Sequence, residues 1–331
     1  RKIISFFKEK GVNKIYDTSF GAEITTWAYL KYITENDFKG LISQPCPAIV
    51  NYIQRWQPDL LQKLSPVHSP MGCTASYMHN YAHITDDIAY ISPCISKYDE
   101  VNHEGTPSYL KYNVTFDHLN EYLRKNQVNL DALEDSEFDD MGYGLGSIYP
   151  RPGGLKENVE ALVKGVWIRQ CEGPHRVYKY IDSYKERVEQ GKELPILVDL
   201  LNCESGCNIG SAAKVVSEEA IDDVDCIMNK ERELILEDRA KDNSVEHRNE
   251  IMKKATSIAF TPMIIVTILA SYLAINYFGF GPTNTSLVFV LTLVGVLFAA
   301  LVVSALFGPV SQFFYAQFKK INFEFKHSII Y

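Results

Sequence analysis

The stretch ILVDLLNCESGCNIG (residues 196–210) decides the fold of this chain. It is a short apolar run that leads directly into a turn containing Ser and Gly, a pattern typical of a buried β-strand. In open α/β sheets, ligands bind at the carboxyl ends of the strands. We therefore expect the thiols of Cys203 and Cys207 at a ligand-binding edge of a sheet.

Two further segments have the same pattern, a short apolar run followed by a turn that contains a cysteine. ISQPCPAIV (residues 42–50) carries Cys46, and AYISPCISKYDE (residues 89–100) carries Cys94. Three strand ends that converge would supply four soft thiolates, which suit an iron–sulfur cluster or zinc. A free cysteine can also be a small buried hydrophobe, and this is our interpretation of the cysteines without a nearby partner in the sequence, Cys73, Cys171 and Cys226.

The net charge of the chain and its first residues each argue against one class of protein. The formal net charge is −8, which argues against a general nucleic-acid binder because such proteins are basic. The opening RKIISFFKEKG lacks the long apolar region of a secretory signal, as expected for a chain with reduced cysteines. The sequence does not begin with Met, so we expect a further segment upstream.

Strand-like and helix-like stretches alternate over residues 1–216. Strands are expected at residues 13–16, 41–43, 88–91, 113–116, 167–171 and 195–200, and helices at residues 48–64, 118–125 and 153–166. This alternation predicts an α/β fold of layered, largely parallel sheets flanked by helices.

The remainder of the chain has a different character. Residues 217–254 are highly charged and predict a solvated helical linker. Residues 255–318 contain no Asp, Glu, Lys or Arg, and two apolar stretches at residues 258–278 and 286–307 have the length that crosses a bilayer. We expect a two-span transmembrane hairpin here; the alternatives are a buried helical hairpin in a soluble protein and a tail joined from a transporter.

Lysines flank this hairpin on both sides. Lys253 and Lys254 precede it, and Lys319 and Lys320 follow it. The positive-inside rule then places both ends in the cytoplasm, with residues 319–331 as a cytoplasmic tail and residues 1–216 as a membrane-anchored cytoplasmic domain.

Taken together, the three cysteine loops resemble those of a known family, the iron-only (FeFe) hydrogenases. In their large subunit, the C-terminal catalytic domain has a Cys-Pro loop, a Pro-Cys-x-x-Lys loop and a Cys-x-x-x-Cys loop. The matching residues are Cys46-Pro47, Pro93 to Lys97, and Cys203 to Cys207. DTSFGAEIT (residues 17–25) and PGGLKENVEAL (residues 152–162) are also similar to family segments, so the resemblance covers about residues 1–216.

The resemblance implies an H-cluster held between two lobes: a 4Fe–4S cubane joined to a di-iron unit with CO, cyanide and a bridging dithiolate. Cys46, Cys94, Cys203 and Cys207 would hold the cubane, and Cys207 would also bridge to the di-iron unit. Lys97 matches the lysine that hydrogen-bonds a cyanide ligand, a charge-assisted contact. Lys97 and Cys207 would thus act in catalysis, and the implied reaction is the anaerobic interconversion of H2 with protons and electrons.

Several residues depart from the pattern of fast enzymes. Pro45 stands where those enzymes have a proton-shuttling cysteine, Ser92 where they have Met, and residues 25–29 (TTWAY) lack the carboxylates of the proton route. These departures resemble the sensory branch of the family and predict slow turnover, because proton transfer needs a chain of donors. The candidate substitutes are Glu23, Tyr29, His68 and Glu204.

Two alternatives remain open. One is a non-enzymatic 4Fe–4S protein on the same fold, acting in cluster assembly or redox sensing; the other is a zinc site, although the long intervals between the loops differ from structural zinc spacings. The chain has no Cys-x-x-Cys-x-x-Cys run. Electrons would come from an upstream segment, a direct donor, or an electron-donor or signalling protein with ferredoxin-like clusters.

Overall fold

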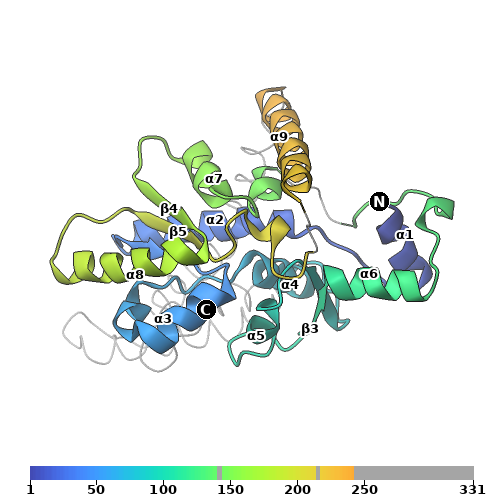
Figure 1. Ribbon diagram of the computed structural model, residues 1–331, viewed down its shortest axis with the longest axis horizontal. Helices are drawn as coiled ribbons and strands as arrows, with labels where there is room; N and C mark the ends of the chain where they lie inside the picture. The colour runs from blue at the N-terminus through green and yellow to red at the C-terminus, as the bar shows by residue number, and fades with distance from the viewer. Residues whose placement is uncertain (140–143, 214–216, 242–331) are drawn as a thin grey trace, which may run out of the picture. The chain divides into compact units, whose positions relative to one another are not determined.

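Three parallel strands form the larger sheet in the described part of the chain, in the order β1 (Leu41–Ile42), β5 (Leu197–Leu201) and β4 (Ile168–Glu172) (Figure 1). Every residue of the central strand β5 is buried. This is the pattern of a parallel strand covered on both faces. The predicted α/β fold with parallel sheets is confirmed.

The computed structural model describes residues 1–139, 144–213 and 217–241. Residues 1–79 and 84–238 belong to one structural unit, to which the account below refers. The predicted transmembrane hairpin, the tail at residues 319–331 and residues 242–254 of the linker lie outside the described residues. Within the described residues, no helix combines the length and the apolar character needed to span a bilayer.

Helices cover both faces of the larger sheet, and the side chains of β5 alternate between them. Val198 and Leu200 face a core shared with α3 (Pro47–Trp56) and α8 (Pro174–Glu189). Leu197 faces a second core, shared with α2 (Thr18–Glu35) and α7 (Gly154–Leu162) (Figure 1). Because strand side chains alternate, Asp199 shares the face of Leu197.

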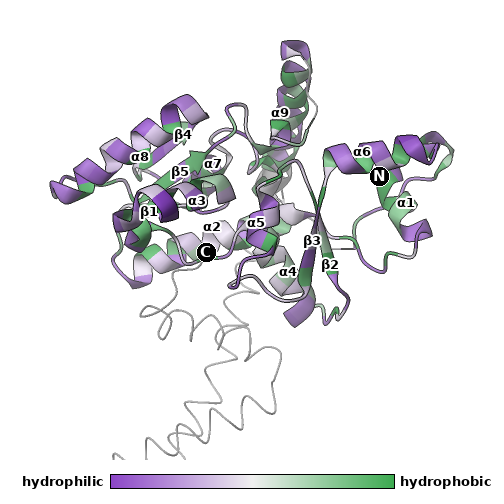
Figure 2. Cartoon of the chain, turned by 60° about the horizontal axis from the view of Figure 1, so that its bottom comes forward, coloured by the Kyte–Doolittle hydropathy of each residue, from purple (hydrophilic) through white to green (hydrophobic). Residues whose placement is uncertain are grey.

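A smaller parallel sheet pairs β2 (Ile88–Ser92) with β3 (Leu110–Thr115). The short helix α5 (Lys97–Val101) follows β2, and α6 (Phe116–Lys125) follows β3. Near this sheet α1 (Lys2–Glu9) packs on α6 through Phe6, Leu119 and Leu123, and Figure 2 shows the two helices side by side. The helix α4 (Pro70–Asn80) precedes the sheet in the chain.

Local signals explain where the helices begin and end. The Asp17 side chain caps α2 by accepting the Ser19 backbone N–H at 2.7 Å. Pro47 lies in the first turn of α3, where its missing N–H costs nothing. The predicted helix at residues 48–64 is in fact two helices, because Pro58 ends α3 near Gln57 and starts the 3-10 helix η1 (Pro58–Lys63).

The predicted strand at residues 13–16 is wrong. Ile15 uses its backbone N–H and C=O for Asp139, at 3.0 and 2.8 Å, instead of pairing in a sheet. The other predicted strands and helices are present, with ends that differ by a few residues or, for residues 48–64, the break just described. The helix α9 (Glu218–Lys241) occupies most of the described part of the predicted linker.

We expect loss of packing to lower stability most at Leu197, because this residue is fully buried and pairs with both Leu41 and Ile168. We expect Leu197→Ala to lower the free energy of unfolding by about 2–5 kcal/mol through lost burial and the cavity left behind. Chemical denaturation measures this. Leu162→Ala, at a position 39% exposed, is the matched control and should cost much less; equal losses would contradict this view of the core.

Candidate functional site

The loops that follow three strands carry the predicted cysteines. Cys46 follows β1 and caps α3, Cys94 follows β2, and Cys203 follows β5. All four predicted thiols, that of Cys207 included, line one cavity of about 1130 Å³. Lys97 lines the same cavity. The structure therefore brings every predicted site residue to one place.

The cysteines of this cavity are buried or half-buried, and their thiols repel one another as thiolates. Burial raises the pKa of the Cys207 thiol well above its ordinary value, and nearby Cys46, Cys203 and Cys94 raise it further. Burial and the charges of Cys46 and Cys94 raise the pKa of Cys203 to about 11. Such thiols ionise together only when a cation compensates them, so metal binding here would displace protons.

Backbone N–H groups lie near two of the sulfur atoms. Burial raises the pKa of Cys46, against the lowering effect of the backbone N–H groups of Asn202 and Ile49. The Ser211 N–H does the same for Cys203. Donors of this kind stabilise a thiolate and tune a bound cluster.

Proline carbonyls tie the Cys-x-x-x-Cys loop to its neighbours. The Cys207 N–H donates to Pro150 O at 2.6 Å, and the Ala212 N–H donates to Pro93 O at 2.8 Å. Gly206 lies in the left-handed region at φ 84°, and a Cβ there would lie 2.6 Å from Pro150 O. Only glycine fits this close approach without strain.

Lys97 is held by a buried polar network. Its Nζ lies 2.5 Å from Glu100 Oε2 and 3.3 Å from Ser69 Oγ, and Ser69 Oγ donates to the other Glu100 oxygen. Burial works against the ammonium, but the charges of Glu100, Tyr90 and Cys94 outweigh it, so the pKa of Lys97 is raised. Lys97 thus stays a fixed cation beside the thiols.

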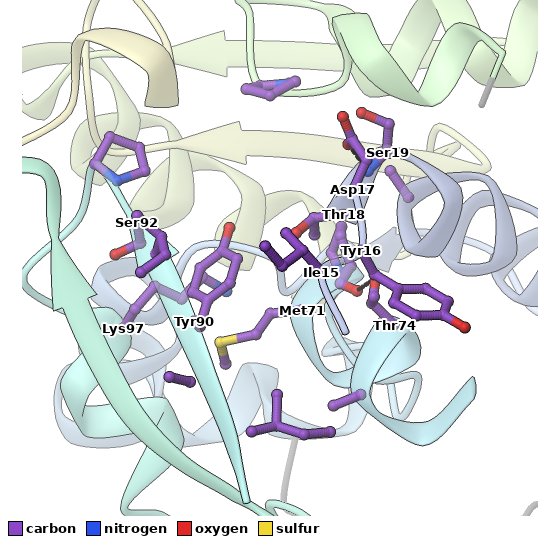
Figure 3. Close-up of a pocket in the computed structure, with 18 of the residues that line it drawn as sticks. Ile15, Tyr16, Asp17, Thr18, Ser19, Met71, Thr74, Tyr90, Ser92 and Lys97 are labelled. Carbon is purple, nitrogen blue, oxygen red and sulfur yellow. Dashed lines mark hydrogen bonds between the residues drawn. The ribbon is translucent and has the colours of Figure 1, made fainter. Parts of the chain in front are cut away.

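Aromatic and thioether side chains complete this wall. Figure 3 shows Tyr90 of β2, Met71 of α4 and Lys97 of α5 converging on the cavity. Burial raises the pKa of Tyr90 to about 12, so its hydroxyl remains a neutral donor at ordinary pH. These groups make the cavity largely apolar with a few oriented donors, as expected for a cofactor site.

Ser92, where fast hydrogenases have Met, holds the Cys94 loop. Its Oγ lies 2.6 Å from Asn113 Oδ1 and 3.0 Å from the Cys94 carbonyl, and Asn113 Nδ2 donates to that carbonyl at 3.0 Å. Pro45 also lines the cavity. Two of the three departures noted in the sequence, Pro45 and Ser92, therefore lie at the site, whereas residues 25–29 do not line the cavity.

The candidate proton-route substitutes are not cavity residues. Glu23, Tyr29, His68 and Glu204 are absent from the described lining of the cavity, although Tyr29 is fully buried and its hydroxyl accepts the Gln44 N–H at 3.2 Å. Five residues at or near the site were not predicted from the sequence: Glu100, Ser69, Tyr90, Tyr149 and Asp199. Of these, only Glu100 could have been found from the sequence, because it is three residues after Lys97 and therefore on the same side of a helix.

The other cysteines lie elsewhere. Cys73 and Cys171 are buried, as interpreted from the sequence, whereas Cys226 is exposed on α9, so for it a core role is wrong. In the described ranges, no three His, Cys, Asp or Glu side chains form a group that could hold a single metal ion. In a cubane each thiolate binds a different iron, so its ligands lie farther apart than those of one ion.

The helix α9 reaches the same cavity from outside. Met228 lines it, and Asn208, next to Cys207, lies 3.4 Å from the Met228 sulfur. Arg232 forms an ion pair with Glu157, which is also bound by Arg151. The first part of the predicted linker is thus docked on the domain.

Comparisons with known proteins identify relatives of residues 1–211. This region matches the family described as "Iron only hydrogenase large subunit, C-terminal domain". Iron hydrogenase 1 from Clostridium pasteurianum is 26% identical over 175 residues, which cover 47% of this chain and 30% of that enzyme's length. The matched part is thus less than a third of that relative.

Solved structures agree on the fold. A variant of the [FeFe]-hydrogenase HydA1 from Chlamydomonas reinhardtii matches with a TM-score of 0.54 and 17% identity, over 69% of this chain and 77% of that chain. The [FeFe]-hydrogenase HydA(deltaEFG), whose structure reveals stepwise H-cluster assembly, matches with a TM-score of 0.53 and 15% identity, over 69% and 76% of the two chains. At these identities the likeness is one of fold.

The close approach at Gly206 generates a first prediction for the site. Gly206→Ala would place a methyl group against Pro150 and Pro152 at a positive φ, so we expect it to cost about 1–3 kcal/mol of stability and to displace Cys207. Denaturation and the iron content after reconstitution measure the two effects.

Gly191→Ala is the matched control for Gly206→Ala. Gly191 also has a positive φ, at 62°, but a Cβ there meets nothing within 4 Å. It should lose stability by backbone strain alone and keep the wild-type iron content. Equal iron loss in both variants would contradict the proposed contact.

The Lys97–Glu100 pair generates a second prediction. Lys97→Met leaves the Glu100 carboxylate buried without its cation, and we expect a loss of about 3–5 kcal/mol in unfolding free energy. The double variant Lys97→Met/Glu100→Gln should lose less than Lys97→Met alone. Removing the exposed pair partner Lys125 by Lys125→Met should change stability little. Additive losses at Lys97 and Glu100 in a double-mutant cycle would refute the coupling.

Proposed function

This chain belongs, over residues 1–211, to the family formed by the C-terminal domain of the iron-only hydrogenase large subunit, and from that premise we propose that it binds an H-cluster and interconverts H2 with two protons and two electrons. One observation carries the proposal. The four motif cysteines and Lys97 line a single cavity, although they come from three loops spread over more than 150 residues of sequence (46 to 207).

The residues present fit the group. Thiols that repel one another as thiolates suit a cationic group that they share, such as the cubane, and the N–H groups near Cys46 and Cys203 suit anionic sulfur. Cys46, Cys94 and Cys203 would hold the cubane, and Cys207 would hold it and bridge to the di-iron unit. When bound, the group supplies the redox chemistry of H2.

The chain's own residues bind, orient and exclude water. The Lys97 ammonium, fixed by Glu100 and Ser69, would donate to an anionic ligand of the di-iron unit. Tyr90 and Met71 exclude water from the same wall. With Pro45 in place of a proton-donating side chain, direct proton delivery beside Cys46 is missing, which supports slow or sensory turnover.

A second function has support from the same departures. Pro45 and Ser92 remove groups that fast turnover needs while leaving the four cysteines in place. A non-enzymatic 4Fe–4S protein, acting in redox sensing or cluster assembly, needs only those four thiols. The two functions differ in the presence of the di-iron unit.

The rest of the chain would connect this domain to its surroundings. Membrane anchoring through residues 255–318, a cytoplasmic domain and an electron-donor or signalling partner with ferredoxin-like clusters remain proposals that rest on the sequence. Carbonate extraction of membranes, followed by detection of the full chain, would test the anchoring.

Infrared spectroscopy of protein matured together with its cluster-assembly enzymes tests the main proposal. We expect iron-bound CO and cyanide bands and H2-dependent reduction of a dye. Cys207→Ala should lose the bands because the bridge to the di-iron unit is gone. Cys171→Ala, a buried cysteine outside the cavity, is the matched control and should keep them.

Three outcomes separate the candidates. Iron and acid-labile sulfide without CO and cyanide bands would favour the non-enzymatic 4Fe–4S protein and refute the hydrogenase. Zinc without sulfide would refute both. Bands that survive Cys207→Ala would show that the ligand assignment is wrong.

A further inference from the structure

A carboxyl group is buried on the far side of the site, under α7. Asp199 in the middle of β5 is only 2% exposed. The nearby backbone N–H of Lys156 lowers its pKa, but its Oδ2 is buried without a hydrogen-bond partner among the described residues. A buried carboxyl with an unpaired oxygen costs stability, so it calls for an explanation.

A second carboxyl lies on the neighbouring strand, diagonally across from Asp199, whose direct partner there is Gln170. Glu172 ends the neighbouring strand β4 and shares the sheet face of Ile168, as Asp199 shares that of Leu197. Glu172 is half-buried, and its Oε1 is buried without a partner in the described chain. Burial, then the charge of Glu172, raise the pKa of Asp199 to about 7, against the lowering effect of the Lys156 N–H and ammonium.

Two tyrosines connect this face to the cavity. Tyr29 of α2 and Tyr149 pack in the same core as Leu197, and both interact electrostatically with Asp199. The two tyrosine hydroxyls also interact with each other, although Tyr149 Oη has no regular hydrogen-bond partner among the described residues. Tyr149 lines the cavity, so this one residue belongs both to the core around β5 and to the wall of the cavity.

The polar atoms along this face are unusually unsatisfied. Those that are buried and have no partner in the described residues include Ser43 Oγ, both polar atoms of the Gln44 amide, Tyr149 Oη, Asp199 Oδ2 and Glu172 Oε1. Internal water is the ordinary partner of such atoms. Each water would add one donor and one acceptor to a connected path.

We propose that Asp199 is a proton-holding group and that Tyr29 and Tyr149 relay its proton to the cysteine cavity, with Glu172 as the exchange point towards solvent. This inference rests on the proposed function and deepens it, because it supplies the proton route that Pro45 and the missing carboxylates of residues 25–29 remove. No residue of the route is a proposed ligand of the cluster.

The transfer balances without any change in oxidation state of the relay. Asp199 gives its proton to a bridging water, which passes one of its own protons to a tyrosine oxygen while that hydroxyl releases its proton onward, so only O–H bonds break and form. Glu172 returns a proton from solvent to Asp199. Burial raises the pKa of both tyrosines above the ordinary value, so they act as neutral hydroxyls. In the cavity, two protons are consumed with two electrons from an iron–sulfur donor, giving H2.

The first test needs no cluster. In the full chain without iron, infrared pH titration should show a protonated carboxyl band that disappears with a midpoint near pH 7, the pKa expected of Asp199. Asp199→Asn should abolish the band, and Glu172→Gln should shift its midpoint to lower pH because a like charge is removed. Asp182→Asn, an exposed aspartate on α8, is the matched control and should leave it unchanged.

Stability gives a second readout on the same protein. The folded pKa of Asp199 lies above the ordinary aspartate value of about 4, so the unfolded state loses its proton first as pH rises. The denaturation midpoint should therefore fall between about pH 4 and pH 7, and Asp199→Asn should flatten that part of the profile.

The second test uses the matured protein. H2 oxidation should fall at least about tenfold in Asp199→Asn and in Tyr149→Phe, while the CO and cyanide bands stay at wild-type intensity. Asp199→Glu should recover part of the rate. Asp182→Asn should keep the wild-type rate.

The outcomes test the protonation of Asp199, the relay and the proposed function separately. A wild-type carboxyl band that is absent at pH 5 to 7, or that survives Asp199→Asn, would overturn the assignment of the proton to Asp199. Wild-type rates in both Asp199→Asn and Tyr149→Phe, with the cluster bands present, would overturn the relay. A wild type without those bands would instead overturn the proposed function, and the relay with it, whatever the titration shows.

Discussion

Mutual repulsion among the thiols gathered in the cavity is the constraint on which the site depends. Burial is the first cause of the raised pKa values of Cys46, Cys203 and Cys207, and the charges of neighbouring cysteines raise each of them further. A protein gains nothing in stability by gathering such groups, since small apolar side chains would pack as well. The arrangement therefore favours the proposal that these thiols share a positively charged partner. The parallel sheets supply the geometry, because the carboxyl ends of β1, β5 and β2 lead into the three loops.

The loops depend on one another more than on the strands that precede them. The carbonyls of Pro93 and Pro150 accept hydrogen bonds from the N–H groups of Ala212 and Cys207. Gly206, which has no side chain, lets the backbone approach Pro150. Proline has no N–H of its own to satisfy, so its carbonyl can serve another segment while its ring restricts the loop. The walls of the cavity therefore come from segments that are far apart in the sequence but joined by direct hydrogen bonds. This favours cysteine positions that are fixed before a ligand binds over positions that adjust on binding.

Much of this could be read from the sequence, and the reasons for the failures are physical. The strand–turn–cysteine patterns are local, so β1, β2 and β5 and their loops were predictable. The break in the helix at residues 48–64 could have been predicted from Pro58. The contact between Glu100 and Lys97 could have been predicted from their spacing of three residues. The strand expected at residues 13–16 failed because Asp139, far along the chain, takes over its hydrogen bonds. Asp199 was hidden in an apolar run, since only the packing of α2 and α7 shows which face of β5 it occupies.

The attachment of α9 has a consequence for how the cavity responds to its medium. Arg232, Glu157 and Arg151 are partly exposed, with side chains 36%, 22% and 20% accessible, so dissolved ions screen their attraction. The proline-bonded loops beneath are held by short-range contacts that ions hardly affect. Rising ionic strength should therefore weaken the attachment of α9, and with it the position of Met228 over the cavity, before it disturbs the loops that carry the cysteines.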